Sequence, residues 1–191
     1  VSEGVDENPI LEEDKKEEYI TEGEVKDDNV LEGKNLVLFE SLLKKADEAF
    51  LQNDYGTSIR YYTEALSYDN SDRVYMGLYS VYMAQSNFAL AKNSIDTAII
   101  LNPTHADYWI SKLLMMNERF DISFSDLQEV FYEGLTKVER MNKVNLVTSF
   151  ARIAEERKLY AEAISLWEYA KALYPQNGIM YDEEINRLRN F

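Results

Sequence analysis

The 191-residue sequence contains no cysteine, a single histidine, three prolines and seven glycines. Without cysteine, neither a disulfide framework nor a thiolate metal site is possible. The histidine, His105, follows Pro103 in a predicted turn and has no second histidine with which to bind zinc or form a catalytic triad. Because so few prolines and glycines cannot supply the many tight turns of a β-sandwich or barrel, the composition favours helices.

Other signals are missing as well. No apolar run approaches the roughly 18 residues that span a bilayer, and the first residues are acidic instead of basic and then apolar. We therefore expect a soluble chain without direct membrane insertion, with the cytoplasm slightly favoured in an otherwise unknown compartment. Glycine-rich phosphate loops, nucleophile elbows and HExxH patterns are lacking. We predict that the chain is not an enzyme and has no cofactor, catalytic residue or metal.

The charge of the chain is strongly acidic and unevenly distributed. The net charge is −15, and positions 1–34 hold thirteen Asp or Glu residues against four Lys residues, a charge of −9. Binding to a phosphate backbone depends on clustered lysine and arginine. We therefore expect no nucleic-acid partner, whereas a basic partner remains compatible with the sequence.

Positions 1–34 are predicted to form a flexible acidic arm. Short apolar islands interrupt the acidic residues at Pro9-Ile10-Leu11, Tyr19-Ile20 and Val30-Leu31, but no helical stripe persists for three turns. One interpretation is a solubilising tail. The other is that the islands are short linear motifs that dock in a groove of this chain or of a partner.

Beyond position 35 the sequence repeats itself. Four segments share an aromatic residue at the start, a bulky apolar residue seven positions later and a small residue three positions after that; they begin at Tyr55, Phe88, Phe124 and Tyr160. The internal spacing is constant while the starts lie 33, 36 and 36 residues apart, so we expect one repeated helix with length differences in the loops. The small residues, which predict close helix crossings, are Ala65, Ala98, Gly134 and Ala170.

Each of these helices follows another amphipathic segment. The preceding segments lie at 36–53, 72–86, 106–118 and about 142–158. Four helix pairs in register predict an all-α helical repeat solenoid and argue against an unrelated bundle, which shows no such period. We expect three parts: the arm at 1–34, four helix pairs at 35–177 and a C-terminal capping helix at 178–191.

These repeats resemble the tetratricopeptide repeat family, whose unit is a helix pair of about 34 residues. The resemblance spans roughly 39–177 and implies a right-handed superhelix of helix-turn-helix units that binds proteins or peptides in a concave groove. The residues that carry it are Asn53-Asp54-Tyr55, Ala65, Asn102-Pro103, Trp167, Ala170 and Pro175.

The third repeat departs from the pattern of the other three. Its turn is two residues longer, between Leu113 and Phe124. Ser125 and Gln128 predict a capping box that restarts the helix after this insertion. We expect this repeat to be the weakest unit and the superhelix to bend there.

The resemblance also implies that the first helix of each pair lines the groove. The middle of this surface is apolar and contains adaptable methionines, so the expected partner is a protein or peptide with an apolar segment. The alternative is that the same side chains pack between neighbouring helices. The residues predicted to line the groove are Leu43, Asp47, Phe50, Arg73, Met76, Met83, Ile110, Leu114, Asn117 and Arg152.

Two functions are therefore open at the level of the sequence. The first is a scaffold that binds a protein or peptide in the groove. The second is a structural spacer or oligomerisation module of a larger protein, including one anchored in a membrane elsewhere, with the groove filled by the acidic arm of the chain.

Overall fold

The computed structural model describes residues 28–191, with side chains from Gly33 onward. Within this range the chain is helical, with no strands, which confirms the predicted all-α class. The α-helices are α1 (Asp28–Leu51), α2 (Tyr55–Ala65), α3 (Asp72–Ala84), α4 (Phe88–Leu101), α5 (Ala106–Arg119), α6 (Phe124–Lys137), α7 (Lys143–Glu156), α8 (Tyr160–Leu173) and α9 (Gly178–Leu188), with short 3-10 helices η1 (Arg140–Asn142) and η2 (Pro175–Asn177).

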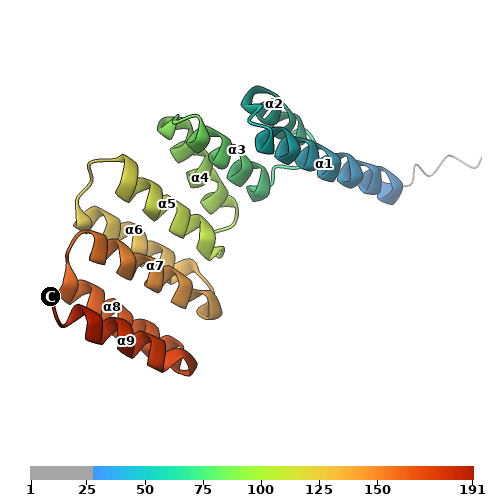
Figure 1. Cartoon of the computed structure of the whole chain (residues 1–191). Coiled ribbons are helices and arrows are strands. Elements are labelled where there is room, and N and C mark those ends of the chain that lie inside the picture. The colour runs from blue at the N-terminus through green and yellow to red at the C-terminus, as the bar shows by residue number, and fades with distance from the viewer. Residues whose placement is uncertain (1–27) are drawn as a thin grey trace, which may run out of the picture.

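The helices form a curved stack of antiparallel pairs (Figure 1). The pairs are α1–α2, α3–α4, α5–α6 and α7–α8, and α9 packs on the last pair. The odd-numbered helices lie side by side in one layer and run in the same direction, while the even-numbered helices form the second layer (Figure 1). This arrangement confirms the predicted helical repeat solenoid.

Helix α1 differs from the sequence prediction in its start. It begins at Asp28, eight residues before the predicted position, so the last part of the expected arm is helical. Since α2 has only 11 residues against 24 in α1, it cannot cover the first turns of its partner. Leu36, Val37 and Leu38 are accordingly 60%, 69% and 47% exposed. The rest of the arm, with its first two apolar islands, lies outside the described residues, and the division at 34/35 stays a prediction.

Three of the four pairs share one turn between their helices. Asn53, Ser86 and Lys158 have positive φ angles of 61°, 57° and 60°, and each lies two residues before the aromatic residue that begins the second helix. A single left-handed residue reverses the chain with few intervening residues. The same turn therefore positions the second helix in pairs one, two and four.

The third pair uses a longer turn and a different cap. Ser123 is the N-cap of α6: the backbone N–H of Asp126 donates to Ser123 Oγ (3.1 Å), and the backbone N–H of Ser123 donates to Asp126 Oδ2 (3.3 Å). The predicted capping box at Ser125 and Gln128 was therefore wrong by two residues. The reason is that the inserted residues extend the loop before the helix and do not enter its first turn.

The small residues predicted at helix crossings are all buried. Ala65, Ala98 and Ala170 are fully inaccessible to solvent, and Gly134 is buried as well. At Gly134 a Cβ atom would come within 2.8 Å of the Trp109 ring. The side chain of α5 therefore packs directly on the backbone of α6, which requires glycine at this position.

Two apolar cores hold the stack together. The first core comprises Phe39, Leu42, Leu43, Ala46, Tyr62, Ala65, Val74, Leu78 and Val81 from α1, α2 and α3. The second core begins at Tyr79 on α3 and continues through α4 to α9. Because α3 contributes to both cores, it joins the first pair to the rest of the molecule.

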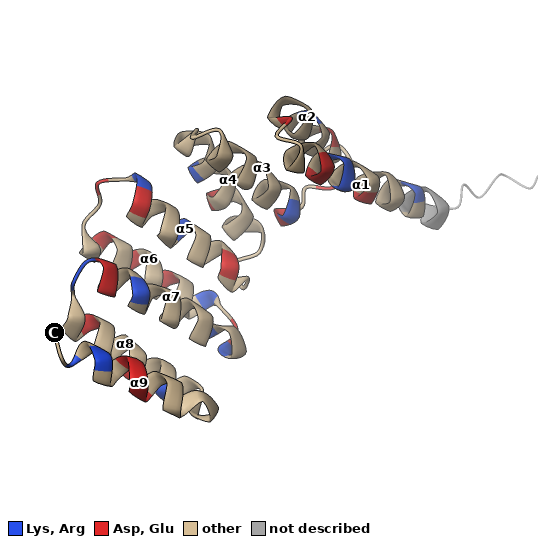
Figure 2. Ribbon diagram, viewed as in Figure 1, with Lys and Arg blue, Asp and Glu red and all other residues tan. Residues whose placement is uncertain are grey.

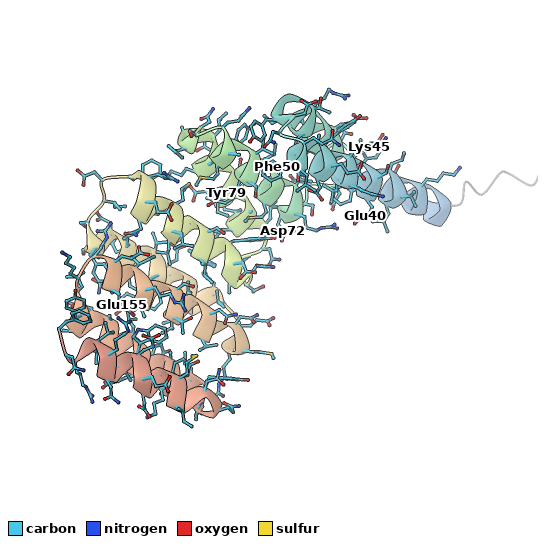
Figure 3. The ribbon with its side chains drawn as sticks, viewed as in Figure 1. Glu40, Lys45, Phe50, Asp72, Tyr79 and Glu155 are labelled. Carbon is cyan, nitrogen blue, oxygen red and sulfur yellow. The ribbon has the colours of Figure 1, made fainter. Side chains whose placement is uncertain are left out.

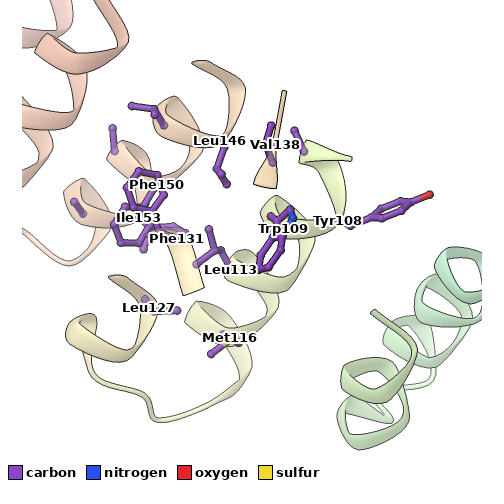
Figure 4. Packing of buried hydrophobic residues seen from close by; sticks show 14 of the residues in the cluster. Tyr108, Trp109, Leu113, Met116, Leu127, Phe131, Val138, Leu146, Phe150 and Ile153 are labelled. Atoms are coloured by element: carbon purple, nitrogen blue, oxygen red, sulfur yellow. The ribbon is translucent and has the colours of Figure 1, made fainter. Parts of the chain in front are cut away.

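The α5–α6 pair packs less extensively than the other three pairs. Leu127 occupies a position at which a small side chain stands in the other pairs, namely Ser58, Ala91 and Ala163. A larger side chain keeps two helices further apart. Phe150 of α7 packs on α6, with its ring centroid 5.1 Å from that of Phe124 and 4.4 Å from that of Phe131. Figure 4 shows Phe150 beside Phe131. The third pair is thus stabilised by an aromatic residue of the fourth.

Substitution of Ala98 by leucine is expected to destabilise the fold. Ala98 is fully buried in α4, and added methylenes in a packed core cost about 1–3 kcal/mol. Ala89→Leu in the same helix is the control: Ala89 is exposed, so this change should alter the unfolding free energy by less than about 0.5 kcal/mol. Urea unfolding measures both, and equal midpoints would show that Ala98 is not at a close crossing.

Gly77 and Gly33 should respond in opposite directions to replacement by alanine. At Gly77 a Cβ would lie 2.3 Å from Tyr62 Cζ, and this ring is 4% exposed, so Gly77→Ala should destabilise by at least about 1 kcal/mol through overpacking. At Gly33, in α1, nothing lies within 4 Å of an added Cβ, so Gly33→Ala should stabilise by about 0.5–1 kcal/mol through helix propensity. Thermal or urea unfolding measures both variants. If both midpoints shifted in the same direction, the close contact at Gly77 or the open position at Gly33 would be contradicted.

Candidate functional site

The ten residues predicted to line a groove do not form one open surface. Leu43 is 6% exposed and belongs to the first core, so the prediction was wrong for this residue. Phe50, Met76, Met83 and Ile110 are partly buried and pack against the two cores. Their apolar atoms are therefore largely engaged between helices, because a helical stripe that faces the inner layer also faces the neighbouring helix.

Two of the predicted polar residues are occupied by partners within the first repeats. The guanidinium of Arg73 donates to both carboxylate oxygens of Glu40, at 2.6 and 3.0 Å, and this hydrogen bonding lowers the pKa of Glu40. Asp47 accepts a hydrogen bond from the hydroxyl of Tyr62. Burial, followed by the interaction with Asp47, raises the pKa of Tyr62. Figure 3 shows Glu40 on α1 beside the start of α3.

Asn117 is also engaged within the chain. Its side-chain amide donates to Glu156 Oε2 at 3.0 Å, and its oxygen accepts from Arg157 Nε at 2.7 Å, which links α5 to the end of α7. Of the ten predicted residues, Leu114 is 36% exposed and Arg152 is exposed without an ion pair inside residues 33–191. Arg152 is the one among them that borders the main hollow described next.

The main hollow lies between α7 and α9 and has a volume of about 430 Å³. Trp167 and Tyr181, both 2% exposed, form its inner wall. Its rim carries apolar side chains that are open to solvent: Met141 is 81% exposed, Met180 45% and Tyr174 42%. Three exposed apolar side chains around one hollow are unusual, because most such residues on a surface occur singly.

Two further hollows continue this one along α7. A polar hollow of about 380 Å³ at the start of α5 shares Asn142 and Asn145 with it, and a hollow of about 410 Å³ toward the end of α9 shares Arg152 and Trp167. We call the three together the α7 groove. The side-chain amides of Asn142 and Asn145 make no hydrogen bond to the described residues. Each therefore offers an N–H donor and a carbonyl acceptor to a ligand.

The segment that forms η1 and most of α7 is rich in cations, although the α7 groove itself is lined by more carboxylates than cations: Asp107, Glu139, Glu155, Glu156 and Glu184 against Arg152 and Arg187. Positions 137–152 contain Lys137, Arg140, Lys143 and Arg152 against one acidic residue, Glu139. None of these four cations has an ion pair within the part of the chain that the structure describes. Figure 2 shows the basic residues at the start of α7 and along it. Of these four cations Arg152 alone lines the α7 groove, so it is the residue of this stretch that can hold a carboxylate there.

Sequence reasoning missed most of the α7 groove. Met141 and Tyr174 lie in or next to the short 3-10 turns, and Met180 lies in α9, which had been assigned only a capping role. A helical stripe cannot reveal residues that lie in turns. The available signal was the occurrence of large apolar residues in polar turns, at Met141 beside Asn142 and at Tyr174 before Pro175.

A polar junction positions α5, and with it the start of the α7 groove, on α3. Asp72 accepts hydrogen bonds from Asn102 Nδ2 (2.8 Å) and from the Tyr108 hydroxyl (2.9 Å), and the hydroxyl of Tyr79 donates to the carbonyl of Ser111 (3.2 Å). These bonds connect Asp72 and Tyr79, both on α3, to residues of α5. The second and third pairs are thus joined by directional contacts as well as by apolar packing.

The junction shifts the protonation of its own groups. Burial alone would raise the pKa of Asp72, but the hydrogen bonds from Asn102 and Tyr108 outweigh it and the pKa is lowered. Burial, together with the nearby carboxylate of Asp72, raises the pKa of Tyr108 to about 12. The junction therefore holds a charged carboxylate and a neutral phenol across the whole neutral range.

His105 occupies a helix start, not a metal site. Its ring is exposed and stacks on that of Tyr108 at a centroid distance of 4.2 Å, and it precedes the first residue of α5. Among the described residues, no three His, Asp or Glu side chains lie close enough together to hold a metal ion. None of the helices within 28–191 combines the length and apolar character needed to cross a membrane.

Comparison with known proteins identified similar folds. No protein-family model and no curated protein matched the sequence. Among solved structures, the pilF protein of Pseudomonas aeruginosa is 13% identical with a TM-score of 0.61 over 81% of this chain and 69% of its own. MamA is 18% identical, with a TM-score of 0.57 over 73% of this chain and 80% of its own. A tetratricopeptide repeat protein of Parabacteroides merdae is 20% identical, with a TM-score of 0.56 over 78% of this chain and 57% of its own.

The α3–α5 junction is expected to weaken in acid. Because the folded-state pKa of Asp72 is lowered, its contribution to stability is present above the unfolded value of about 3.9 and is lost as the pH falls from there through the folded-state pKa. Asp72→Asn should therefore lower the unfolding free energy at pH 7 and differ less from the parent at pH 3. Urea titrations at both values measure this difference.

The control for this experiment is Asp69→Asn. Asp69 is exposed and its side chain makes no hydrogen bond or ion pair to the described residues, so this change should have little effect at either pH. If the Asp72 variant kept the full pH dependence of the parent, the junction would not depend on the carboxylate charge.

Proposed function

We propose that this chain, whose fold is the tetratricopeptide-type helical repeat, is a protein-binding scaffold that holds an extended peptide segment in the α7 groove. The observation that carries the proposal is the hollow between α7 and α9, where exposed Met141, Met180 and Tyr174 surround a buried aromatic wall. The ligand that fits is a segment with a bulky apolar side chain flanked by carboxylates.

The apolar part of the hollow is suited to anchor one side chain of a peptide. Its volume of about 430 Å³ falls in the range of ligand pockets. Trp167 is fixed in place because its indole N–H donates to Glu155 Oε1 at 2.7 Å, and Glu155 also pairs with Arg187. A wall that is already ordered costs little entropy on binding, while Met141 and Met180 adapt to different side chains.

The backbone of an extended ligand would lie across Asn142 and Asn145. Both amides are exposed and lack partners among the described residues, and an amide side chain matches the donor and acceptor of a peptide group. These two residues connect the polar hollow to the apolar one. Hydrogen bonds to the ligand backbone would fix its direction without selecting its side chains.

Arg152 supplies the charge preference of the main hollow. Arg152 borders two of the three hollows, whereas the nearby Arg187 is already paired with Glu155 and Glu184. An arginine without a partner beside a groove favours a carboxylate ligand, which it can hold through two parallel hydrogen bonds. The preference applies to the main hollow, because the polar hollow is lined by Asp107 and Glu139 and the third hollow by three glutamates.

A second candidate function is a spacer or oligomerisation module. The observation that favours it is the set of exposed apolar residues near the start of α1, at Leu36, Val37 and Leu38. A pure spacer would show no preferred peptide in the α7 groove, which separates the two candidates. The absence of enzymatic activity, of a nucleic-acid partner, of a cofactor and of a metal, as well as the compartment, stay predictions from the sequence.

Peptides displayed on phage and selected on the full chain should share one bulky apolar residue next to Asp or Glu. The affinity of a synthetic selected peptide, measured by fluorescence polarisation, should fall at least about tenfold in Met180→Glu and in Arg152→Glu, because each change places a carboxylate where the ligand brings an apolar group or a carboxylate. Circular dichroism checks that both variants keep their helices.

The matched control is Ile100→Glu, an equally drastic change at a 78% exposed position of α4, away from the groove. It should leave peptide affinity unchanged. Selected peptides without a common pattern, or binding that neither groove variant weakens, would overturn the proposed function.

A further inference from the structure

We infer that the α7 groove of the free protein is occupied by the acidic N-terminal segment of the same chain, with the island Pro9-Ile10-Leu11 in the hollow between α7 and α9. The inference rests on the proposed function, because it assigns an internal occupant to the same groove. Charge, side-chain chemistry and reach each point to this segment.

The main hollow offers a cation, Arg152, with which an acidic segment can pair. Positions 1–27 hold eleven Asp or Glu residues and three Lys residues, a net charge of −8, while positions 137–152 carry +3. Arg152, the one charged residue that lines the main hollow, has no ion pair among the described residues, whereas Arg187 in the adjoining hollow is paired with Glu155 and Glu184. Opposite potentials favour encounter and orientation of the two surfaces.

The island has the side-chain chemistry that the groove fits. Ile10 and Leu11 are bulky apolar residues, and Glu7 precedes them while Glu12 and Glu13 follow. Pro9 fixes its own φ and restricts the residue before it to extended conformations. An extended segment that is partly ordered in advance loses less entropy when it binds, which favours this island over the proline-free pair Tyr19-Ile20.

The segment is long enough to reach the groove from the start of α1. The residues 12–27 separate the island from Asp28 and span up to roughly 55 Å when extended, at about 3.4 Å per residue. Because several neighbours in the odd-numbered layer, such as α3 and α5, do not pack closely, each step is taken as a full helix diameter of about 10–12 Å, and four steps from α1 to α9 amount to about 40–50 Å. Because these helices run in the same direction, α1, η1 and η2 begin on the same side of the stack (Figure 1).

The absence of native cysteine allows a direct test on the full chain. A nitroxide attached at Gln176→Cys in η2, next to the hollow but not among its lining residues, should broaden the amide signals of residues 7–13 to less than half their intensity. A nitroxide at Gln85→Cys, which follows the last residue of α3 and so lies on the side of the stack opposite η2 (Figure 1), is the control and should leave these signals unchanged. The double substitution Ile10→Glu and Leu11→Glu should restore them in the first sample.

Equal amide intensities of residues 7–13 with the labels at positions 176 and 85 would overturn the inference. The proposed function would then still be tested separately by the peptide selection. Broadening that occurs only when an isotope-labelled chain without nitroxide is mixed with a nitroxide-bearing chain would also overturn it, since the occupant would be a second copy. The Ile10→Glu and Leu11→Glu variant should bind a selected peptide about three- to tenfold more tightly than the parent. If the signals of residues 7–13 are broadened and no selected peptide restores them, the segment is docked but the groove does not bind peptides. This result would support the inference and contradict the proposed function.

Discussion

The stack depends on the close approach of paired helices at a few small, fully buried residues. Ala65, Ala98 and Ala170 leave no space for a larger side chain, and at Gly134 even a Cβ would meet the Trp109 ring. Such crossings fix the distance between the two layers, because helix separation is set by the side chains at the contact. The positions of the exposed side chains in the odd-numbered layer, including those of the α7 groove, depend on how these pairs are placed.

The one pair that departs from this rule is held by the next pair in the stack. Leu127 replaces a small residue in the α5–α6 pair, which is less tightly packed, and Phe150 enters between Phe124 and Phe131. Helix α7 is therefore held by aromatic stacking on α6 as well as by its own partner α8. Its inner side remains free for the groove, with Asn142, Asn145 and Arg152 exposed along it.

Much of the fold, but little of the site, could be predicted from the sequence. Periodic apolar residues report burial, so the four helix pairs and the crossing residues followed from spacing. The start of α1 did not, because positions 28–35 show no apolar stripe. Which residues are available to a ligand could not be predicted for another reason. Whether Arg73 or Asn117 is free depends on Glu40 and Arg157, which lie 33 and 40 residues away in sequence. Pairing across helices leaves no local signal.

An internal occupant changes what a partner needs in order to bind. A short flexible tether gives an effective concentration of roughly 1 mM. If the segment alone bound with a Kd of about 0.1 mM, it would fill the groove about 90% of the time and weaken the apparent affinity of a partner about tenfold. Contacts between exposed charges are screened within about 8 Å at physiological salt, so the apolar island would have to supply most of this affinity. A modest apolar contact, not the large charge of the segment, would thus set the threshold for a partner.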